Sequence, residues 1–266
     1  MKFLITGGTG SFGTHYTEYL LGQGHEVTIL SRNELKQWEM KKRFPDAKYL
    51  IGDVRDRTAI YAAAERQDYV IHAAALKHVA TGETQPWEVI QTNVNGTKNV
   101  VDASNANGCR MVLLSTDKAV EPVNLYGASK MMAERIVIEG MQRVVRYGNI
   151  FGSSGSILHI FRKQAANGHR FTITDMRMTR FLLTFKEAMK IVDSATCASR
   201  GTYTIPALKA IRITDLALAF DENAQFDEIG IQPGEKLAEK LTPFFSSDDA
   251  DKYSVAEIKE LIDEHV

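Results

Sequence analysis

The sequence has few cysteines, no long apolar run and almost no net charge. Cys109 and Cys197 form neither a CxxC pair nor a disulfide framework, so we expect a reducing cytoplasmic setting with both thiols buried and inert. No apolar run approaches the roughly 18 residues of a membrane span, and the strand-like start KFLITGG does not resemble a signal peptide. Lys+Arg 32 against Asp+Glu 33 leave a formal net charge of -1. This balance argues against nucleic acid or a membrane as the main partner. No metal site is predicted.

Short β-type runs alternate with helical patterns through the first 150 residues. The runs KFLIT, EVTIL, KYLIG, YVIHAAA, MVLLST and RVVRYG are interspersed with helical patterns at 15–21, 57–64, 87–106 and 126–138. Apolar runs of this kind predict strands buried on both faces of a parallel sheet. The expected fold class is therefore α/β, with a Rossmann-type doubly wound parallel sheet.

The pattern becomes less regular after about residue 150. Helices are expected at 157–167, 186–199 and 213–220, with the strands RFTIT and TYTIP between them, and a capping box of Ser254 and Glu257 predicts a final helix. We interpret residues 1–150 as an NADP-binding Rossmann domain and residues 151–266 as a compact, interleaved substrate-binding cap.

A glycine-rich turn follows the first strand. Gly7, Gly10 and Gly13 have the spacing GxxGxxG, which permits a tight turn, close approach of the backbone to a pyrophosphate and an anion site at a helix N-terminus. The alternative is a plain glycine-rich turn. The candidate cofactor-binding residues here are Gly7, Thr9, Gly10, Ser11, Phe12 and Gly13.

The end of the second strand indicates which nicotinamide cofactor is bound. NAD enzymes usually place an acidic residue here, but this chain has Ser31 and Arg32, and a hydroxyl with a guanidinium suits a 2′-phosphate. We therefore predict NADP(H), the alternative being that Arg32 is a solvated loop residue. Other candidate cofactor contacts at strand ends are Asp53 and Val54, and Ala73, Ala74 and Ala75, although the alanines are also compatible with tight core packing.

The string YGASK, residues 126–130, forms the second chemical motif. Tyr126 and Lys130 share one face of a helix, and an ammonium beside a phenol stabilises the phenolate. Tyr126 is thus a candidate general base with Lys130 as its partner, and both are also expected to contact the cofactor. Thr116, at the end of the preceding strand, is expected to supply a hydroxyl to the phenol, with Ser115 as the alternative. The competing interpretation is a packed tyrosine and an exposed lysine at a helix start.

These motifs stand within longer strings that resemble one known family. TGGTGSFG, SRNELKQWEM, HAAALKHV, TNVNGTKNV, LSTDKAVEPVNLYGASK, VRYGNIFG and PGEKL are similar to the UDP-N-acetylglucosamine 4,6-dehydratases, especially the C5-inverting branch, within the extended short-chain dehydrogenase/reductases. The resemblance implies oxidation at C4 of the sugar, loss of water across C5 and C6, and hydride return to C6. The implied substrate is UDP-N-acetylglucosamine or a related UDP-sugar.

The resemblance also implies roles for single residues. Lys118, kept neutral with the help of Lys130 and the nicotinamide, would take the C5 proton, and a protonated Asp117 would give a proton to the departing C6 hydroxyl. The alternative for this pair is a solvated loop. Asn93 would order the active site beside the cofactor or simply kink its helix. The remaining implied residues are substrate contacts: Lys77, His78, Asn149, Arg180 and Glu235.

Three rival functions remain open from the sequence. A UDP-sugar 4-epimerase needs Tyr126, Lys130 and NADP(H) but no acid and base at C5 and C6, and a 5,6-dehydratase stops before hydride return. An NADP-sensing Rossmann protein would need no chemistry, and retention of the pair Asp117 and Lys118 argues against it. Because enzymes of this fold often pair helices beside the active site, we expect a homo-oligomer formed through the helices at 87–106 and 126–138.

Overall fold

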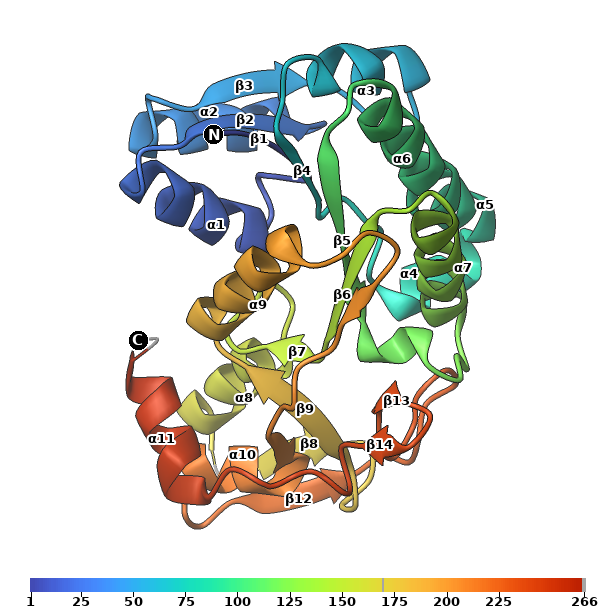
Figure 1. Cartoon of the computed structure of the whole chain (residues 1–266). Coiled ribbons are helices and arrows are strands. Elements are labelled where there is room, and N and C mark those ends of the chain that lie inside the picture. Colours follow the sequence, from blue (N-terminus) through green and yellow to red (C-terminus); the bar gives the residue numbers. More distant parts are fainter. Residues whose placement is uncertain (169, 265–266) are drawn as a thin grey trace.

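A seven-stranded parallel sheet forms the centre of the molecule (Figure 1). In the computed structural model, which describes residues 1–168 and 170–264, the strand order is β10-β6-β5-β4-β1-β2-β3, and every neighbouring pair is parallel. The expected Rossmann-type fold class is confirmed. The strands of this sheet are β1 (Lys2–Thr6), β2 (Glu26–Ser31), β3 (Lys48–Ile51), β4 (Tyr69–His72), β5 (Arg110–Thr116), β6 (Arg143–Tyr147) and β10 (Tyr203–Thr204).

Helices cover both faces of this sheet, because its central strands are apolar on both sides. In β1, Phe3 and Ile5 face one hydrophobic core whereas Leu4 faces the other. The first core lies under α1 (Ser11–Gly22), α2 (Glu34–Arg43) and α9 (Phe185–Cys197). The second lies under α3 (Arg57–Ala64), α6 (Gly96–Ala106) and α7 (Leu125–Glu139). This two-sided covering places the carboxyl ends of the strands along one open edge, where a ligand site is expected.

Side-chain caps fix where several helices begin. Asp56 caps α3 by accepting from the Ala59 amide, and Asn124 caps α7 by accepting from the Gly127 amide. The expected capping box is present, since Ser254 Oγ accepts from the Glu257 amide while the Glu257 carboxylate accepts from the Ser254 amide. The helix expected at 87–106 is built from α5 (Pro86–Val89), the π-helix η1 (Ile90–Asn95) and α6, preceded by α4 (Val79–Thr84).

A smaller body lies beyond the carboxyl ends of the strands (Figure 1), with its own core of residues such as Phe161, Phe171 and Ile258. Its sheets pair β9 with β11 and β7, β8 with β12, and β13 with β14. Its helices are α8 (Ile157–Ala166), α10 (Ile213–Phe220) and α11 (Val255–Glu264). Its strands are β7 (Asn149–Ile150), β8 (Arg170–Ile173), β9 (Thr179–Leu183), β11 (Ala210–Arg212), β12 (Gln225–Glu228), β13 (Lys240–Thr242) and β14 (Phe245–Ser246).

The chain does not enter this smaller body once and stay there. After β7 it forms α8, β8 and β9, then returns through α9 and β10 to the main sheet, where Tyr203 and Thr204 pair with Val144 and Val145 of β6. It then leaves again through β11. The smaller body is thus built from two separate stretches of chain.

The two cysteines differ in their exposure. Cys109 is buried, but Cys197 at the end of α9 is exposed, so the expectation that both thiols are buried is wrong for the second. The amphipathic α9 turns one face into the core, and Cys197 lies on the other. Among the described residues, no helix combines the length and apolar character needed to cross a bilayer.

Candidate active site

A cavity of about 640 Å³ opens along the carboxyl ends of the parallel strands. This volume lies within the range of about 300–1,000 Å³ that is common for small-molecule sites. The glycine-rich turn, the end of β2, the segment after β4 and the start of α7 all contribute to its wall. The predicted site residues that line it are Gly7, Thr9, Gly10, Ser11, Phe12, Gly13, Ser31, Arg32, Asp53, Val54, Ala73, Ala74, Ala75, Lys77, His78, Thr116, Lys118, Tyr126, Lys130 and Asn149.

The glycine-rich turn and the alanines after β4 touch one another. Gly7 has φ +68°, and a Cβ there would lie 2.7 Å from Cα of Ala74, so the close approach needs glycine at this position. The turn leads directly into α1, whose N-cap Gly10 brings no side-chain hydrogen bond to the helix start. Backbone amides at this end are the donors that a pyrophosphate uses. The residues present therefore fit a dinucleotide.

The adenosine end of the cavity carries basic side chains. Arg32 follows β2 with its side chain 52% exposed, and Nη1 lies 3.6 Å from Oδ2 of Asp53. Burial alone would raise the pKa of Asp53, but Arg55 and Arg32 outweigh it and lower this pKa below its usual value. Lys36, on the first turn of α2, lines the same corner. Lys36 was not among the residues predicted to contact the cofactor. Its position in the first turn of the helix that follows Ser31, Arg32 and Asn33 could have indicated this role.

Tyr126 and Lys130 lie at the opposite end, on the first turns of α7. Burial raises the pKa of Tyr126 to about 12, whereas Lys118 and a hydrogen bond with Thr116 lower it. Burial also lowers the pKa of Lys130 to about 8, and its ammonium donates to the Leu114 carbonyl at 2.6 Å. Lys118 is therefore a cation that opposes the effect of burial on the phenol.

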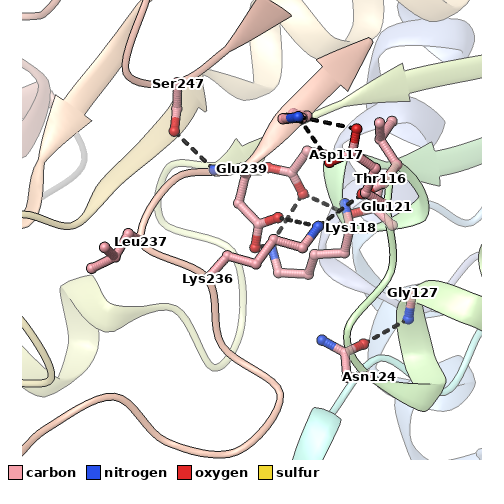
Figure 2. A network of polar contacts seen from close by, with 12 residues as sticks. Thr116, Asp117, Lys118, Glu121, Asn124, Gly127, Lys236, Leu237, Glu239 and Ser247 are labelled. Carbon is pink, nitrogen blue, oxygen red and sulfur yellow. Dashed lines mark hydrogen bonds and ion pairs between the residues drawn. The ribbon is translucent and has the colours of Figure 1, made fainter. Parts of the chain in front are cut away.

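Asp117, which is buried, and Lys118, which is partly exposed, form an ion pair on the short turn η2 (Asp117–Ala119), which follows β5. Lys118 Nζ lies 3.0 Å from Asp117 Oδ1 and 3.4 Å from Glu239 Oε1, as Figure 2 shows. Burial would lower the pKa of Lys118, but the carboxylates of Asp117 and Glu239 outweigh it and raise this pKa above its ordinary value, with Arg180 opposing them. The expectation that Lys130 depresses the Lys118 pKa is therefore wrong for this arrangement, because two acidic groups face the ammonium.

A glycine fixes the spacing between this turn and the catalytic helix. A Cβ on Gly127 would overlap the carbonyl oxygen of Lys118, so α7 and η2 pack more closely than any side chain would allow. Thr116 Oγ1 donates to Asp117 Oδ1 at 2.9 Å and accepts from the Lys118 amide at 3.3 Å. Thr116, Asp117, Lys118 and Tyr126 thus form one rigid group, of which only Asp117 does not line the cavity.

A largely buried ion pair joins the second half of α7 to β6. Arg146 on β6 donates to both carboxylate oxygens of Glu134 on α7, and Nη1 donates to the Leu241 carbonyl at 2.8 Å. Glu134 also accepts from Ser115 Oγ at 2.5 Å. Ser115 is therefore engaged with the scaffold, which favours Thr116 over Ser115 as the hydroxyl at the phenol.

The loop after β7 crosses from the smaller body to the glycine-rich turn. Ser154 Oγ lies 2.7 Å from Ser11 Oγ, and the Ser154 carbonyl accepts from Lys77 Nζ at 2.7 Å. Ser153, Gly155 and Ser156 also line the cavity. This loop joins the two walls of the cavity.

Besides Asp117, three predicted residues lie away from the cavity wall. Asn93 in η1 accepts from the Leu76 amide and donates to the Leu76 carbonyl and to Ser129 Oγ, so its amide orders the segment before Lys77. Arg180 on β9 donates to the carbonyls of Thr179 and Leu237. The Glu235 carboxylate accepts from the Gln232 amide at 3.2 Å within its own turn. None of the three side chains is among the lining residues.

Comparison with known proteins identifies the family. Residues 3–261 match the polysaccharide biosynthesis protein family. The chain belongs to this family. The UDP-N-acetylglucosamine 4,6-dehydratase (inverting) of Campylobacter jejuni is 44% identical over 265 residues, which cover 94% of this chain and 78% of that protein. The resemblance stated from the sequence motifs is therefore confirmed.

Two further relatives frame the comparison. The UDP-glucose 4-epimerase of Rickettsia rickettsii is 39% identical over 260 residues, covering 90% of this chain and 76% of that protein. The X-ray structure of Pen from Bacillus thuringiensis superposes with a TM-score of 0.91 at 30% identity, covering 99% of this chain and 97% of that one. The first of these relatives is named for 4-epimerisation and not for dehydration.

Proposed function

We propose that this protein is a sugar-nucleotide 4,6-dehydratase that acts on UDP-N-acetylglucosamine and recycles a bound nicotinamide cofactor. The observation that carries the proposal is the ion pair of Asp117 and Lys118 beside Tyr126, since dehydration needs an acid and a base in addition to the groups that oxidise C4. The 44% identity to a protein named for this activity supports it.

The side chains divide the reaction between them. Tyr126, whose pKa burial raises to about 12 while Lys118 and Thr116 oppose that rise, takes the proton of the C4 hydroxyl once it is in its phenolate form. The nicotinamide, when bound, supplies the hydride acceptor for C4 and the hydride donor for C6. The 4-keto group makes the C5 proton acidic, so Lys118 can remove it while Asp117 protonates the departing C6 hydroxyl. Lys118 then returns a proton to C5, and the product is a 4-keto-6-deoxy sugar nucleotide.

The proton needed by this acid and base can come from within the pair. Asp117 Oδ1 and Lys118 Nζ are 3.0 Å apart, so moving one proton from the ammonium to the carboxylate produces a neutral amine and a carboxylic acid without changing the total charge. Elimination then restores the ammonium and the carboxylate. The raised pKa of Lys118 makes this transfer uphill, because the carboxylate that accepts the proton also stabilises the ammonium, so the neutral amine is the minor form of the pair.

The cofactor proposed is NADP(H). Arg32 and Lys36 meet at the adenosine end of the cavity, and both are cations suited to a 2′-phosphate. Asp53 stands on the neighbouring strand end but is already neutralised by Arg55, whose Nη2 lies 2.6 Å from Oδ2. This corner therefore offers positive charge where an NAD enzyme usually offers a carboxylate.

The second candidate is 4-epimerisation, which the identity of 39% to a protein named UDP-glucose 4-epimerase favours. The two activities differ in mass balance. Incubating the purified protein with UDP-N-acetylglucosamine and NADP⁺, followed by mass spectrometry and NMR of the nucleotide sugar, separates them. Loss of one water with a new methyl group at C6 supports 4,6-dehydration, and loss of water with a C5–C6 double bond indicates a 5,6-dehydratase. An unchanged mass with inverted C4 overturns the proposal.

Variants test the division of roles. Tyr126→Phe should abolish all chemistry. Asp117→Asn should still permit cofactor reduction at C4, and Lys118→Ala should permit it at a lower rate because this variant also removes the cation beside the phenol. Both variants should slow water loss by about 10²–10⁴-fold, the usual contribution of general acid or base catalysis. Reduction of the cofactor is followed at 340 nm and water loss by mass. Dehydration at the wild-type rate in both variants would show that the pair is structural.

A further inference from the structure

Glu239 is a buried carboxylate between two lysines, in the segment that precedes β13. It is 3% exposed. Its Oε1 lies 3.4 Å from Lys118 Nζ, and its Oε2 lies 3.4 Å from Lys236 Nζ (Figure 2). Within the described residues Oε2 makes no hydrogen bond. A carboxylate with this little hydrogen bonding is costly to bury unless nearby cations compensate for it.

The backbone at Glu239 is held firmly, so the placement of this carboxylate is built into the fold. The Ser247 amide donates to the Glu239 carbonyl at 2.7 Å, and the Glu239 amide donates to Ser247 Oγ at 3.0 Å. Ser247 in turn donates to the Thr179 carbonyl at 3.1 Å. The smaller body therefore presents Glu239 to the turn that carries Lys118.

The charged and titratable groups around Lys118 come from four parts of the chain. Asp117 belongs to the same turn, Tyr126 to α7, Arg180 to β9 and Glu239 to the segment before β13. Two carboxylates thus face one ammonium, with the guanidinium of Arg180 opposing them. Lys236 shares the charge of Glu239 and also donates to the Val120 carbonyl at 2.8 Å.

We propose that Glu239 is a positioning residue that sets the basicity of Lys118 during dehydration. This inference rests on the proposed function. Glu239 is not part of the cavity wall, so it acts through Lys118 and does not touch the sugar. When Lys118 takes the C5 proton it becomes an ammonium, while Asp117 gives its own proton to the C6 oxygen and becomes a carboxylate. Glu239 is the second negative charge that stabilises this ammonium.

Lys236 moderates the same effect. Without a cation on its far side, Glu239 would hold the proton on Lys118 more strongly and reduce the fraction of neutral amine. Removing the charge of Glu239 and removing the charge of Lys236 should therefore shift the Lys118 equilibrium in opposite directions. A merely structural role for this cluster predicts no such pair of opposite shifts.

The test follows the entry of solvent deuterium at C5 of the product by NMR, as a function of pH, with saturating UDP-N-acetylglucosamine. Exchange requires neutral Lys118, so its rate rises with pH through the Lys118 pKa. Glu239→Gln should move this rising limb to lower pH by about one unit, the low end of the shift caused by one neighbouring charge, and should lower the plateau because the base is weaker. Lys236→Gln should move the limb to higher pH, and Glu239→Asp should restore most of the wild-type profile.

Glu121→Gln is the matched control. Glu121 pairs with Lys240 at 2.8 Å in the same region, but its side chain is 58% exposed, and the ion-pair partners of Lys118 among the described residues are Asp117 and Glu239. Its profile should superimpose on that of the wild type. If the wild type dehydrates and exchanges at C5, but the exchange rate of the Glu239 and Lys236 variants rises at the same pH as in the wild type, the inference is wrong. If the wild type neither loses water nor exchanges at C5, the proposed function fails first. Should Glu239→Gln not fold, the Lys236→Gln limb alone decides.

Discussion

Replacing Arg32 with aspartate should convert a preference for NADP⁺ into a preference for NAD⁺. Arg32 is one of two cations at the adenosine end of the cavity, and its side chain is held loosely, with Asp53 at 3.6 Å and about half of its surface exposed. A hydrogen bond to a charged group contributes roughly 1.5–3 kcal/mol, and solvent screening at a half-exposed site places Arg32 at the lower end. The lost contact alone then weakens NADP⁺ binding about tenfold.

The new carboxylate adds a second effect of the same sign. An aspartate at this position repels a 2′-phosphate but can accept from a ribose 2′-hydroxyl. We therefore expect NADP⁺ affinity to fall about 10- to 100-fold, while NAD⁺ affinity stays constant or rises. Lys36→Gln should weaken NADP⁺ by less, since it removes one charge without introducing another.

Isothermal titration calorimetry with both cofactors measures these affinities directly. Arg43→Asp is the matched control, because Arg43 also belongs to the region of α2 and has 55% side-chain exposure, but pairs with Glu18 and does not line the cavity. It should change neither affinity. Equal wild-type affinity for NADP⁺ and NAD⁺, or an equal loss of both in Arg32→Asp, would refute the reasoning.

Two further predictions concern stability and assembly. Arg146→Met should lower the free energy of unfolding by about 3–5 kcal/mol, because it leaves the Glu134 carboxylate buried without its partner, and adding Glu134→Gln should recover part of this loss in urea unfolding. The helices α5 and α7 expose Trp87 and Met132, and we expect them to form the contact of a homo-oligomer. Light scattering at micromolar concentration should then show at least a dimer, and a strict monomer would contradict this.

The sequence predicted the core of the fold because its signals are local. β1 and β4 are apolar runs that need no partner to be recognised, and α3 and α10 end where their apolar periodicity ends. The short strands of the smaller body have no such signal. β13 and β14 contain three and two residues, and their pairing depends on contacts made after the chain has folded.

The same distinction applies to the site. Gly7 stands in a motif whose spacing permits a tight turn, and Tyr126 and Lys130 stand four residues apart on one helix face. All three line the cavity. Glu239 lies far along the chain from Lys118, in the smaller body, and only the packing of that body against η2 brings the two together. The repeated Glu and Lys in PGEKLAEK were visible, but a run of alternating charge ordinarily indicates a solvated surface.

The division of the smaller body into two stretches implies an order of assembly during synthesis. Once β10 has left the ribosome, every strand of the seven-stranded sheet exists, together with the glycine-rich turn, Tyr126 and Lys130. β8 and β9 must still wait for β12 and β11, their partners from the last stretch. Since chains fold progressively from the N-terminus as they emerge, a nascent chain can acquire its dinucleotide cradle while Lys118 still lacks the opposing carboxylate of Glu239.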